Sequence, residues 1–517
     1  MGGDPRDYLF TRRLFLRSLG CIYLAAFLSY WMQADGLVGS QGILPAAKFL
    51  EAVSRTQGAE GYYLCPTLFW LCPTDGFLHL LCSGGVVLSL LSLSGLMPPL
   101  VFFLLWAFYL SLVRIGGDFY HFQWDILLLE TGLLAVFFAP WKLLPARTGE
   151  APPSLLSLLL VRWLLFRLMF ESGAVKLLWN DETWWNLTAL NYHYQTQPLP
   201  TWVGWYAHQL PEWFQKTSVA IMYLLELAVP FFAFLPRRFR LAGFFALAGF
   251  QILILLTGNY CFFNALAIVL CIPLADDRLF AKFRWRRRPR EAPVESPAGI
   301  PERRDPPVKT VLTWAFAALV LVMSVIQLVE MFGSPRIRGR DPAGAAGGWR
   351  ELAGNLQRWL APFDPVNSYG LFRVMTTTRP EIIVEGSEDG RNWQAYEFKW
   401  KPGDLKRRPG FVEPHQPRLD WQMWFAALRG EGQLAALGRV SQLDGWFQNF
   451  LYRLLTGSPP VLSLLEKNPF AEKPPRYLRA LLYEYRFTDP ATRRETGDWW
   501  RREPKGILCP PVSLNNG

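Results

Sequence analysis

The stretch LLSLLLVRWLLFRLMFESGAVKLL, residues 155–178, decides the fold class of this chain. It is long and apolar enough to cross a bilayer core of roughly 30 Å, which needs about 20 residues in a helix. It nevertheless contains four charged residues, Arg162, Arg167, Glu171 and Lys176. A charge at the centre of a membrane helix costs about 2.5–3.5 kcal/mol even on the gentler insertion scales. The stretch therefore predicts a membrane helix whose charges have partners or a function.

The composition of the whole chain agrees with a membrane protein. Of its 517 residues, 51% are hydrophobic and 18% are charged, whereas soluble domains carry about 25% charged residues. Residues before about position 280 are strongly apolar, and those after about position 333 resemble a soluble domain. The formal net charge of +11 comes largely from basic clusters beside the apolar runs. That placement favours topology determinants and anionic lipid headgroups over nucleic acid as partners.

Apolar runs of spanning length recur along the first two thirds of the chain. The first run follows basic residues but lacks a small-residue cleavage site, so we interpret it as an uncleaved span and not as a signal peptide. We predict a polytopic α-helical membrane protein with about nine spans and a C-terminal mixed α+β domain outside the membrane. The predicted spans are 14–33, 78–96, 98–115, 125–141, 155–178, 217–235, 239–257, 260–274 and 309–332.

The distribution of basic residues predicts the orientation of these spans. With the N-terminus in the cytoplasm, the strongest basic clusters all fall on the cytoplasmic side, as the positive-inside rule requires. The predicted domains are a membrane helical domain (1–281), a basic Pro-rich cytoplasmic linker (282–308), a final transmembrane helix (309–332) and a lumenal or periplasmic domain (333–517). The triplet Asn186-Leu187-Thr188 lies on the far side and is a possible glycosylation acceptor.

The C-terminal region has the patterns of a mixed domain. Residues 381–403 alternate apolar and polar side chains around a Ser-Glu-Asp-Gly turn, which predicts a β-hairpin. Residues 420–430, 445–457 and 461–468 have the spacing of amphipathic helices, and 480–489 the composition of a strand. We therefore expect a sheet rich in hairpins with helices packed against it.

Ionisable residues inside the spans form a predicted buried network. Its members are Glu130, Arg162, Arg167, Glu171, Lys176 and Glu226. Arg167 and Glu171 are four residues apart and can meet on one helix face, while Arg162 and Lys176 lie near opposite helix ends and can snorkel. The glutamates on other spans need cations, and Arg167 is the obvious donor. The network either fixes helix register or forms a site that binds or processes a ligand.

A second polar cluster is predicted at the far-side membrane surface. It consists of Asp118, His121, Asp125, Tyr192 and His193. Aromatic residues at this depth usually form an interfacial belt, but a polar cleft with His121 or His193 as acid or base is the alternative. The sequence contains no nucleophile motif, phosphate-binding loop, dinucleotide fingerprint or zinc spacing, so we expect no catalytic residue, metal or cofactor. Cys65 and Cys72 could form a disulfide.

Several long segments together resemble the lipase maturation factor family. They span nearly the full chain and include LVGSQGILPA (37–46), FYHFQWDILLLETGLLAVFFAPW (119–141), VRWLLFRLMFESGAVKL (161–177), LTALNYHYQTQPLP (187–200), LLELAVPFF (224–232), LTGNYCFFNALAIVL (256–270), NSYGLFRVMTTTRPEIIVEGSEDG (367–390), WQAYEFKWKPGD (393–404) and PRLDWQMWFAAL (417–428). The resemblance implies a multispanning endoplasmic reticulum protein that helps secreted lipases reach their active, assembled state. It also implies a lumenal C-terminal region that engages the client. The chain departs from the family in lacking a long charged tail.

These observations lead to one main hypothesis and two alternatives. The main hypothesis is a non-catalytic maturation factor whose C-terminal domain holds a secreted, lipase-like client. It has membrane lipids as further partners and neither cofactor nor nucleic acid. Its expected location is the endoplasmic reticulum membrane, or the inner membrane in a bacterium. The alternatives are a membrane enzyme that modifies a protein or lipid at the far-side surface, and a transporter, which would not need so large a far-side domain.

Overall fold

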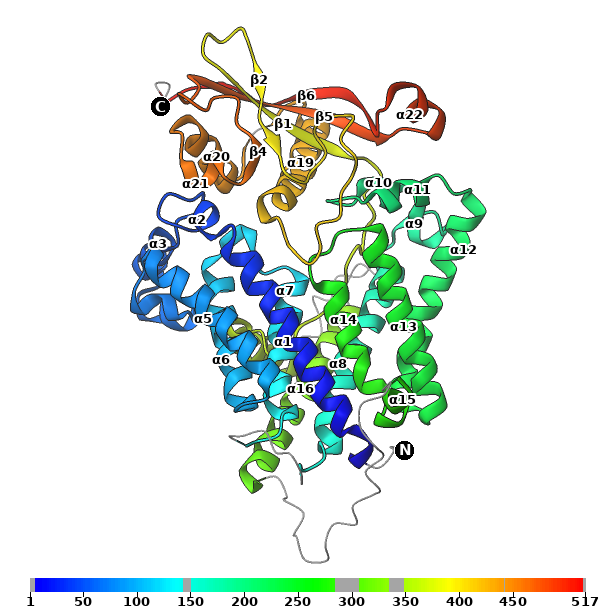
Figure 1. Cartoon of the computed structure of the whole chain (residues 1–517). Coiled ribbons are helices and arrows are strands. Elements are labelled where there is room, and N and C mark those ends of the chain that lie inside the picture. Colours follow the sequence, from blue (N-terminus) through cyan, green and yellow to red (C-terminus); the bar gives the residue numbers. More distant parts are fainter. Residues whose placement is uncertain (1–4, 143–149, 284–305, 334–347, 441, 515–517) are drawn as a thin grey trace, which may run out of the picture.

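The computed structural model describes residues 5–142, 150–283, 306–333, 348–440 and 442–514. These residues form a helical bundle with a smaller α+β domain at one end (Figure 1). The N-terminus lies at the opposite end of the bundle from the sheet of that domain (Figure 1). The two parts share one continuous buried apolar core.

Long apolar helices make up most of the bundle. Within the described part of the chain, six helices are long and apolar enough to cross a membrane. They are α1 (Leu9–Trp31), α5 (Asp75–Ser94), α6 (Pro98–Ile115), the helical stretch Glu212–Phe234 that begins with α12 (Glu212–Tyr223), α13 (Arg237–Thr257) and α16 (Pro307–Gly333). Each buries one side inside the bundle and leaves apolar side chains exposed on the other. That distribution is expected for helices that face lipid. The chain is therefore a multi-pass membrane protein.

The other three predicted spans are also helical but do not meet these criteria of length and composition. They are α7 (Gln123–Phe138), α8 (Leu155–Leu178) and α14 (Phe263–Cys271), which continues as the 3-10 turn η7 (Ile272–Leu274). Helix α7 has 16 residues, and α8 contains four charged residues. The predicted count of nine spans thus exceeds the six that length and composition support.

Helix α8 is buried around most of its circumference. It contacts α7, α14 and α16, together with the end of the α12 stretch. Its two arginines, its glutamate and its lysine are all buried. A helix enclosed in this way lies away from lipid, so neighbouring helices can satisfy its polar groups.

Short helices occupy the connections near the α+β domain. After α8 come α9 (Glu182–Trp185), α10 (Leu190–Thr196) and α11 (Trp202–His208). Between α1 and α5 lie α2 (Ala34–Leu37), α3 (Ala46–Gln57), η2 (Gly58–Glu60), α4 (Gly61–Leu64) and η3 (Leu68–Leu71). The remaining short elements are η1 (Pro5–Tyr8), η4 (Gly117–Phe119), α15 (Asp277–Phe283), α18 (Gly348–Leu360) and η8 (Ala361–Phe363).

The C-terminal domain is built on a four-stranded antiparallel sheet of order β2-β1-β5-β6. Its strands are β1 (Pro380–Ser387), β2 (Gln394–Ala395), β5 (Tyr477–Phe487) and β6 (Trp500–Val512). Helix α19 (Arg418–Leu437) packs against β1 and β5 and lies between the sheet and the bundle (Figure 1). Helices α20 (Gly445–Leu455) and α22 (Pro490–Thr496) complete the domain. The predicted hairpin is present as β1 paired with β2.

The prediction of a helix over residues 461–468 was wrong. The segment contains only the end of the short helix α21 (Pro459–Leu462), followed by strand β4 (Leu465–Lys467). Strand β4 pairs antiparallel with β3 (Glu397–Phe398). Pairing with a distant strand therefore overrides the local apolar spacing, which a short window cannot detect.

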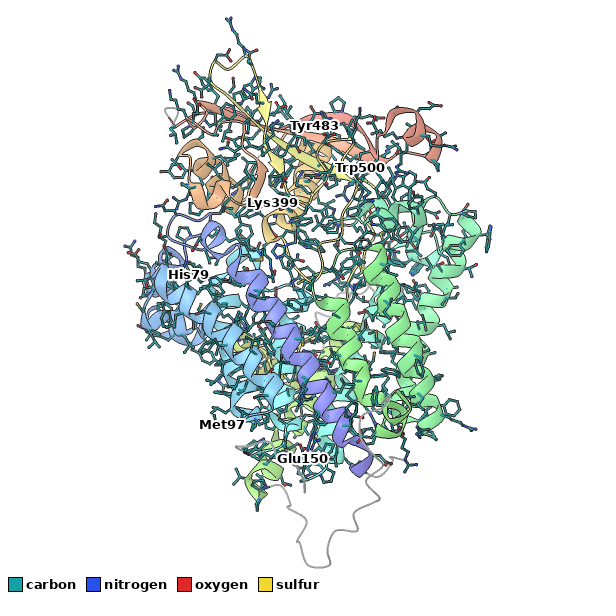
Figure 2. The ribbon with its side chains drawn as sticks, viewed as in Figure 1. His79, Met97, Glu150, Lys399, Tyr483 and Trp500 are labelled. Carbon is teal, nitrogen blue, oxygen red and sulfur yellow. The ribbon has the colours of Figure 1, made fainter. Side chains whose placement is uncertain are left out.

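Ion pairs to Glu150 fix the end of the molecule that lies opposite the sheet. Figure 2 shows Glu150 at the N-terminal end and Trp500 in the sheet at the other end. Arg12, which is fully buried, places Nη2 2.7 Å from Glu150 Oε1, and Arg13 Nε lies 2.8 Å from Glu150 Oε2. The predicted linker 282–308 lies largely outside the described residues.

Candidate functional site

A segment between η8 and β1 enters the helical bundle. Residues 364–375 have no regular secondary structure, yet Asn367 and Tyr369 are buried among the membrane helices. Gln327 of α16 donates from Nε2 to the carbonyl oxygen of Val366 at 3.1 Å. We call residues 364–375 the insertion segment. It leads from η8 to strand β1 and passes through the protein core.

The insertion segment reaches the charges that the sequence predicts to be buried. Glu130 of α7 forms an ion pair with Arg167 of α8, and both side chains are almost fully buried. Glu130 Oε2 accepts from the backbone N of Asn367 at 2.9 Å and from the hydroxyl of Tyr369 at 2.8 Å. Arg167 Nη1 donates to the carbonyl oxygen of Asn367 at 2.8 Å. A buried ion pair needs additional hydrogen bonds of this kind to offset its desolvation.

Glu171 binds the insertion segment directly. Its Oε2 accepts from the backbone N of Tyr369 at 2.8 Å. The sequence-based pairing of Arg167 with Glu171 along one helix face is replaced by these two separate attachments. Arg167 binds Glu130 on α7 and the carbonyl oxygen of Asn367, whereas Glu171 binds the backbone N of Tyr369.

The remaining predicted network residues form two other groups. Lys176 Nζ lies 2.7 Å from Glu226 Oε2, so the cation for Glu226 is Lys176 and not Arg167. Arg162 donates from Nε to the carbonyl oxygen of Pro273 at 3.0 Å and from Nη2 to the hydroxyl of Tyr8 at 3.0 Å. Arg162 and Lys176 are 4% and 5% exposed. The expectation that they snorkel was wrong, because both find partners inside the bundle.

The predicted far-side cluster lies under the C-terminal domain. Asp125, at the start of α7, is fully buried and binds both Nη atoms of Arg418 from α19, each at 2.7 Å. The guanidinium of Arg418 also lies 4.0 Å from the ring centroid of Tyr120. His121 Nε2 lies 3.1 Å from Asp364 Oδ1, and Asp364 also binds Arg114. In this region the α+β domain covers the membrane helices through paired charges.

The two histidines and Asp118 occupy different surroundings. His193 Nε2 lies 3.0 Å from the hydroxyl of Tyr260, which donates to Gln197 Oε1 at 2.6 Å. Burial, reinforced by Lys176, lowers the pKa of His193 to about 4, so its imidazole is neutral near pH 7. Asp118 is exposed, but partial desolvation by neighbouring groups, reinforced by the carboxylate of Asp444, raises the pKa of its carboxyl. Tyr192 is partly buried in a small apolar cluster with Trp184.

The chain's other predicted sites are placed as follows. Asn186 is exposed at the end of α9. Cys65 is buried and Cys72 exposed, and neither is in a disulfide. Burial raises the pKa of the Cys65 thiol to about 11. Within the described parts of the chain, no group of three or more His, Cys, Asp or Glu residues could hold a metal ion.

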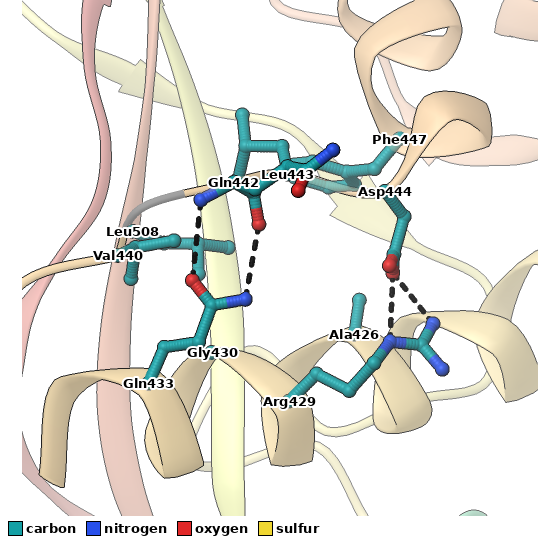
Figure 3. A pocket seen from close by; sticks show the side chains of 10 residues that line it. All are labelled: Ala426, Arg429, Gly430, Gln433, Val440, Gln442, Leu443, Asp444, Phe447 and Leu508. Atoms are coloured by element: carbon teal, nitrogen blue, oxygen red, sulfur yellow. Dashed lines mark hydrogen bonds and ion pairs between the residues drawn. The ribbon is translucent and has the colours of Figure 1, made fainter. Parts of the chain in front are cut away.

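A small pocket on the C-terminal domain lies between α19 and the loop that leads to α20. Arg429 forms an ion pair with Asp444, and Gln433 exchanges two hydrogen bonds with the backbone of Gln442 (Figure 3). The enclosed volume is about 10 Å³, which is room for about one water molecule. These contacts fix the loop against α19 and leave no space for a larger ligand.

Sequence reasoning missed Asp364, Asn367, Tyr369 and Arg418 as partners of the membrane charges. All four lie beyond the last span, in the part of the chain expected to be extramembrane. The available signal was indirect. Asp125 lies at the start of a span, in the stretch FYHFQWDILLLE, which contains no Lys or Arg, so a permanently charged partner had to come from elsewhere.

Both parts of the chain match models of known domains. Residues 10–282 match the lipase maturation factor transmembrane domain, and residues 365–510 match the lipase maturation factor C-terminal domain. The chain belongs to the lipase maturation factor family. The ion pair between Asp125 and Arg418 joins the family's two domains, because Asp125 lies in the first match and Arg418 in the second. Glu130 of the first match also accepts a hydrogen bond from Asn367 of the second.

Curated members of the lipase maturation factor family align over almost the entire chain. Lipase maturation factor 2 of Gallus gallus is 38% identical, covering 100% of this chain and 83% of the relative. The human lipase maturation factor 2 is 36% identical over 98% of this chain and 83% of the relative. Lipase maturation factor 1 of Bos taurus is 32% identical over 97% of this chain and 89% of the relative. No solved structure matches the chain.

Proposed function

We propose that this chain is a membrane-embedded, non-catalytic maturation factor that assists the folding, assembly and export of a secreted lipase. Family membership supports this role, since the similar proteins carry the name lipase maturation factor. The client binds the C-terminal domain on the far side of the membrane. The N-terminus is cytoplasmic, α7, α8 and α14 complete nine spans, and the membrane is that of the endoplasmic reticulum, or the inner membrane in a bacterium.

The observation that carries the proposal is an apolar row on the sheet. Ile383, Leu481 and Ile507 are aligned across β1, β5 and β6 by the strand register. Directly opposite residues in antiparallel strands share a face. The other face packs on α19, where Leu508 meets Gly430. Ile507 is 56% exposed, so this end of the row is available to a client.

The buried ion pairs support the same role. A rigid attachment of the C-terminal domain to the membrane helices keeps the sheet at a fixed distance from the bilayer. An apolar surface held in this way can bind exposed apolar parts of an incompletely assembled protein without losing entropy on ordering itself.

The test uses cells that lack their own maturation factor and express one secreted lipase. The full chain is expected to restore secreted lipase activity and to co-purify with the lipase. Ile507→Asp is expected to lower both readouts about five- to thirtyfold at unchanged chain abundance, which is the effect of losing one apolar contact of about 1–2 kcal/mol in an interface. Leu437→Asp, at a position 60% exposed on α19, is the matched control and should behave like the parent chain.

Two results would contradict the proposal. The first is a full chain that reaches the membrane in normal amount and restores no lipase activity. The second is an Ile507→Asp variant with unchanged activity and unchanged co-purification, which would exclude the apolar row as the client surface. Point variants are preferable to deletion of the C-terminal domain, because deletion would also remove the insertion segment from the bundle and leave Glu130 with fewer partners.

A further inference from the structure

A large chamber lies inside the membrane part of the protein, away from the ion pairs that attach the C-terminal domain. It has a volume of about 530 Å³, within the 300–1,000 Å³ typical of small-molecule sites. Its walls come from α8 to α14 and the insertion segment. Most lining side chains are apolar or aromatic, including Phe214, Ile221, Leu225, Phe250, Leu253 and Phe372.

The chamber is open toward the membrane. Phe214 and Ile221, on the α12 side, are 39% and 52% exposed, and Leu253 of α13 is 62% exposed. Both helices belong to the set that is long and apolar enough to span a bilayer. Apolar side chains exposed at this position face lipid. A ligand can therefore enter sideways from the bilayer.

The charged groups of the chamber are already paired. Lys176 and Glu226 both line it, and Lys176 Nζ lies 3.0 and 2.7 Å from the two carboxylate oxygens of Glu226. Gly173 allows this approach, because a Cβ at that position would lie 2.8 Å from Glu226 Cβ. The pair contributes no net charge. An anionic or cationic ligand would thus enter a low-dielectric site without a counter-ion, which is unfavourable.

Two buried side chains that line the chamber, Gln251 and Asn264, carry polar atoms without a hydrogen-bond partner among the described residues. Gln251 of α13 is 3% exposed, and its Nε2 is 3.7 Å from Met169 Sδ. Its Oε1 has no hydrogen-bond partner among the described residues. Leaving a buried carbonyl oxygen unsatisfied costs about 1–3 kcal/mol. A hydroxyl donor placed in the chamber would remove this cost.

The helix beside the chamber is irregular at the same level. Residues Leu224–Ala228 form a π-helical turn and Val229–Phe234 a 3-10 turn, and Leu225 and Glu226 of the π turn line the chamber. Single π turns inside helices occur frequently at functional sites, since they interrupt regular packing. The irregular part of this helix thus lies directly beside the chamber.

We propose that the chamber binds an uncharged membrane lipid that carries a free hydroxyl group. The hydroxyl donates to Gln251 Oε1, and the acyl chain lies along the apolar wall formed by α12 and α13. The pairing of Lys176 with Glu226 favours an uncharged headgroup, and the unpartnered Oε1 of Gln251 favours a hydrogen-bond donor. The opening toward the bilayer favours a lipid over a water-soluble ligand. This binding site goes beyond the client role and does not depend on it.

The test is photo-crosslinking of the full chain in native membranes. The probe is a monoacylglycerol with a diazirine in its acyl chain and an alkyne tag. Fatty acid and phosphatidylcholine with the same modified chain are the comparison probes. We expect the monoacylglycerol probe to label peptides of α8, α12 and α13, and excess unlabelled monoacylglycerol to prevent this.

Two variants locate the site. Gln251→Leu removes the acceptor and is expected to lower labelling at limiting probe about three- to tenfold, the effect of one lost hydrogen bond. Ser218→Trp fills the chamber from α12 and is expected to abolish labelling there. Phe245→Ala is the control, because Phe245 lies on α13, is 55% exposed and does not line the chamber.

Each other outcome overturns the proposal. Equal labelling by all three probes means contact with bulk lipid only. Preference for the fatty acid means a charged ligand. Labelling that survives Ser218→Trp lies outside the chamber, and labelling lost in Ser218→Trp but unchanged in Gln251→Leu excludes recognition of the hydroxyl. Lipase secretion by the same variants is a separate readout, so failure of lipid binding and failure of the client role are distinguishable.

Discussion

Arg418 and Asp125 form a two-point ion pair across the boundary between the membrane helices and the C-terminal domain. Arg418 Nη1 lies 2.7 Å from Asp125 Oδ2 and Nη2 lies 2.7 Å from Oδ1, and both side chains are almost completely buried. Two parallel charge-assisted hydrogen bonds fix orientation as well as distance. The pair therefore sets how α19 sits on the start of α7.

Arg418→Met should loosen this attachment. Removing one partner of a buried ion pair leaves an uncompensated charge and costs about 3–5 kcal/mol. We expect a large fall in the thermal midpoint of the purified full chain. The control is Arg429→Ala, which breaks the exposed pair with Asp444 and should cost at most about 1 kcal/mol. Similar midpoints for the two variants would contradict the structural role of Arg418.

The insertion segment should open locally when Tyr369 loses its hydroxyl. Tyr369→Phe removes the 2.8 Å donor to Glu130, and a hydrogen bond to a charged group contributes about 1.5–3 kcal/mol. The expected result is faster trypsin cleavage after the exposed Arg373, because local opening limits cleavage there. Tyr452→Phe, at a position 53% exposed on α20, should leave the cleavage rate unchanged. An unchanged rate in Tyr369→Phe would show that this hydroxyl does not hold the segment.

His415 makes the domain attachment weaker in acid. Its Nδ1 lies 3.0 Å from Ser29 Oγ of α1, and burial together with Arg418 and Lys399 lowers its pKa from 6.5 to about 4. The folded state thus favours the neutral ring. The neutral His415 ring contributes fully to the free energy of unfolding above pH 6.5. This contribution, at most about 3 kcal/mol, is lost as the pH falls toward 4. As the pH falls from 6.5 to 4, the thermal midpoint of His415→Gln should rise relative to that of the parent chain. A constant difference across this pH range would contradict the assignment.

Glu413 has the opposite pH dependence. Its Oε1 accepts from the backbone N of Tyr260, and burial raises the pKa of the carboxyl from 4.5 to about 8. The folded state favours the protonated form. The protonated Glu413 carboxyl contributes fully to the free energy of unfolding below pH 4.5, and this contribution is lost as the pH rises toward 8. Compared with the parent chain, Glu413→Gln should become relatively more stable as the pH rises through this range. Because the two groups oppose each other between pH 4.5 and 6.5, the single variants should show slopes of opposite sign there.

Glycan attachment can test the proposed topology. In a eukaryotic membrane the exposed Asn186 triplet is expected to carry a glycan if the 179–216 loop is lumenal. Thr188→Ala removes the acceptor and should abolish the glycosidase-sensitive mobility shift. In that background Val294→Asn creates an acceptor in the 282–308 linker, which should remain unmodified. Modification of the linker and not of Asn186 would reverse the orientation.

Much of the fold was predictable because its signals are local. A span is recognised from the length and apolarity of one continuous segment, and all nine predicted segments are helical, although six meet the criteria for spanning. The β1–β2 hairpin was predictable because its turn and alternation lie within one stretch. The helix expected over 461–468 failed because β4 depends on pairing with the distant β3.

The sequence by itself determined that charges would lie inside the bundle. Glu130, Arg167 and Glu171 lie within apolar runs, and a charge in such a run must be buried and paired because hydrocarbon cannot solvate it. Only the tertiary structure decided their partners. Arg418 is 293 residues from Asp125, and Asn367 is 237 residues from Glu130. No local pattern encodes such contacts, because they arise when the chain beyond the last span folds back into the bundle. The same folding back places Arg418 against Asp125 and Asp364 beside His121, so it turns a predicted open mouth into the attachment of the C-terminal domain.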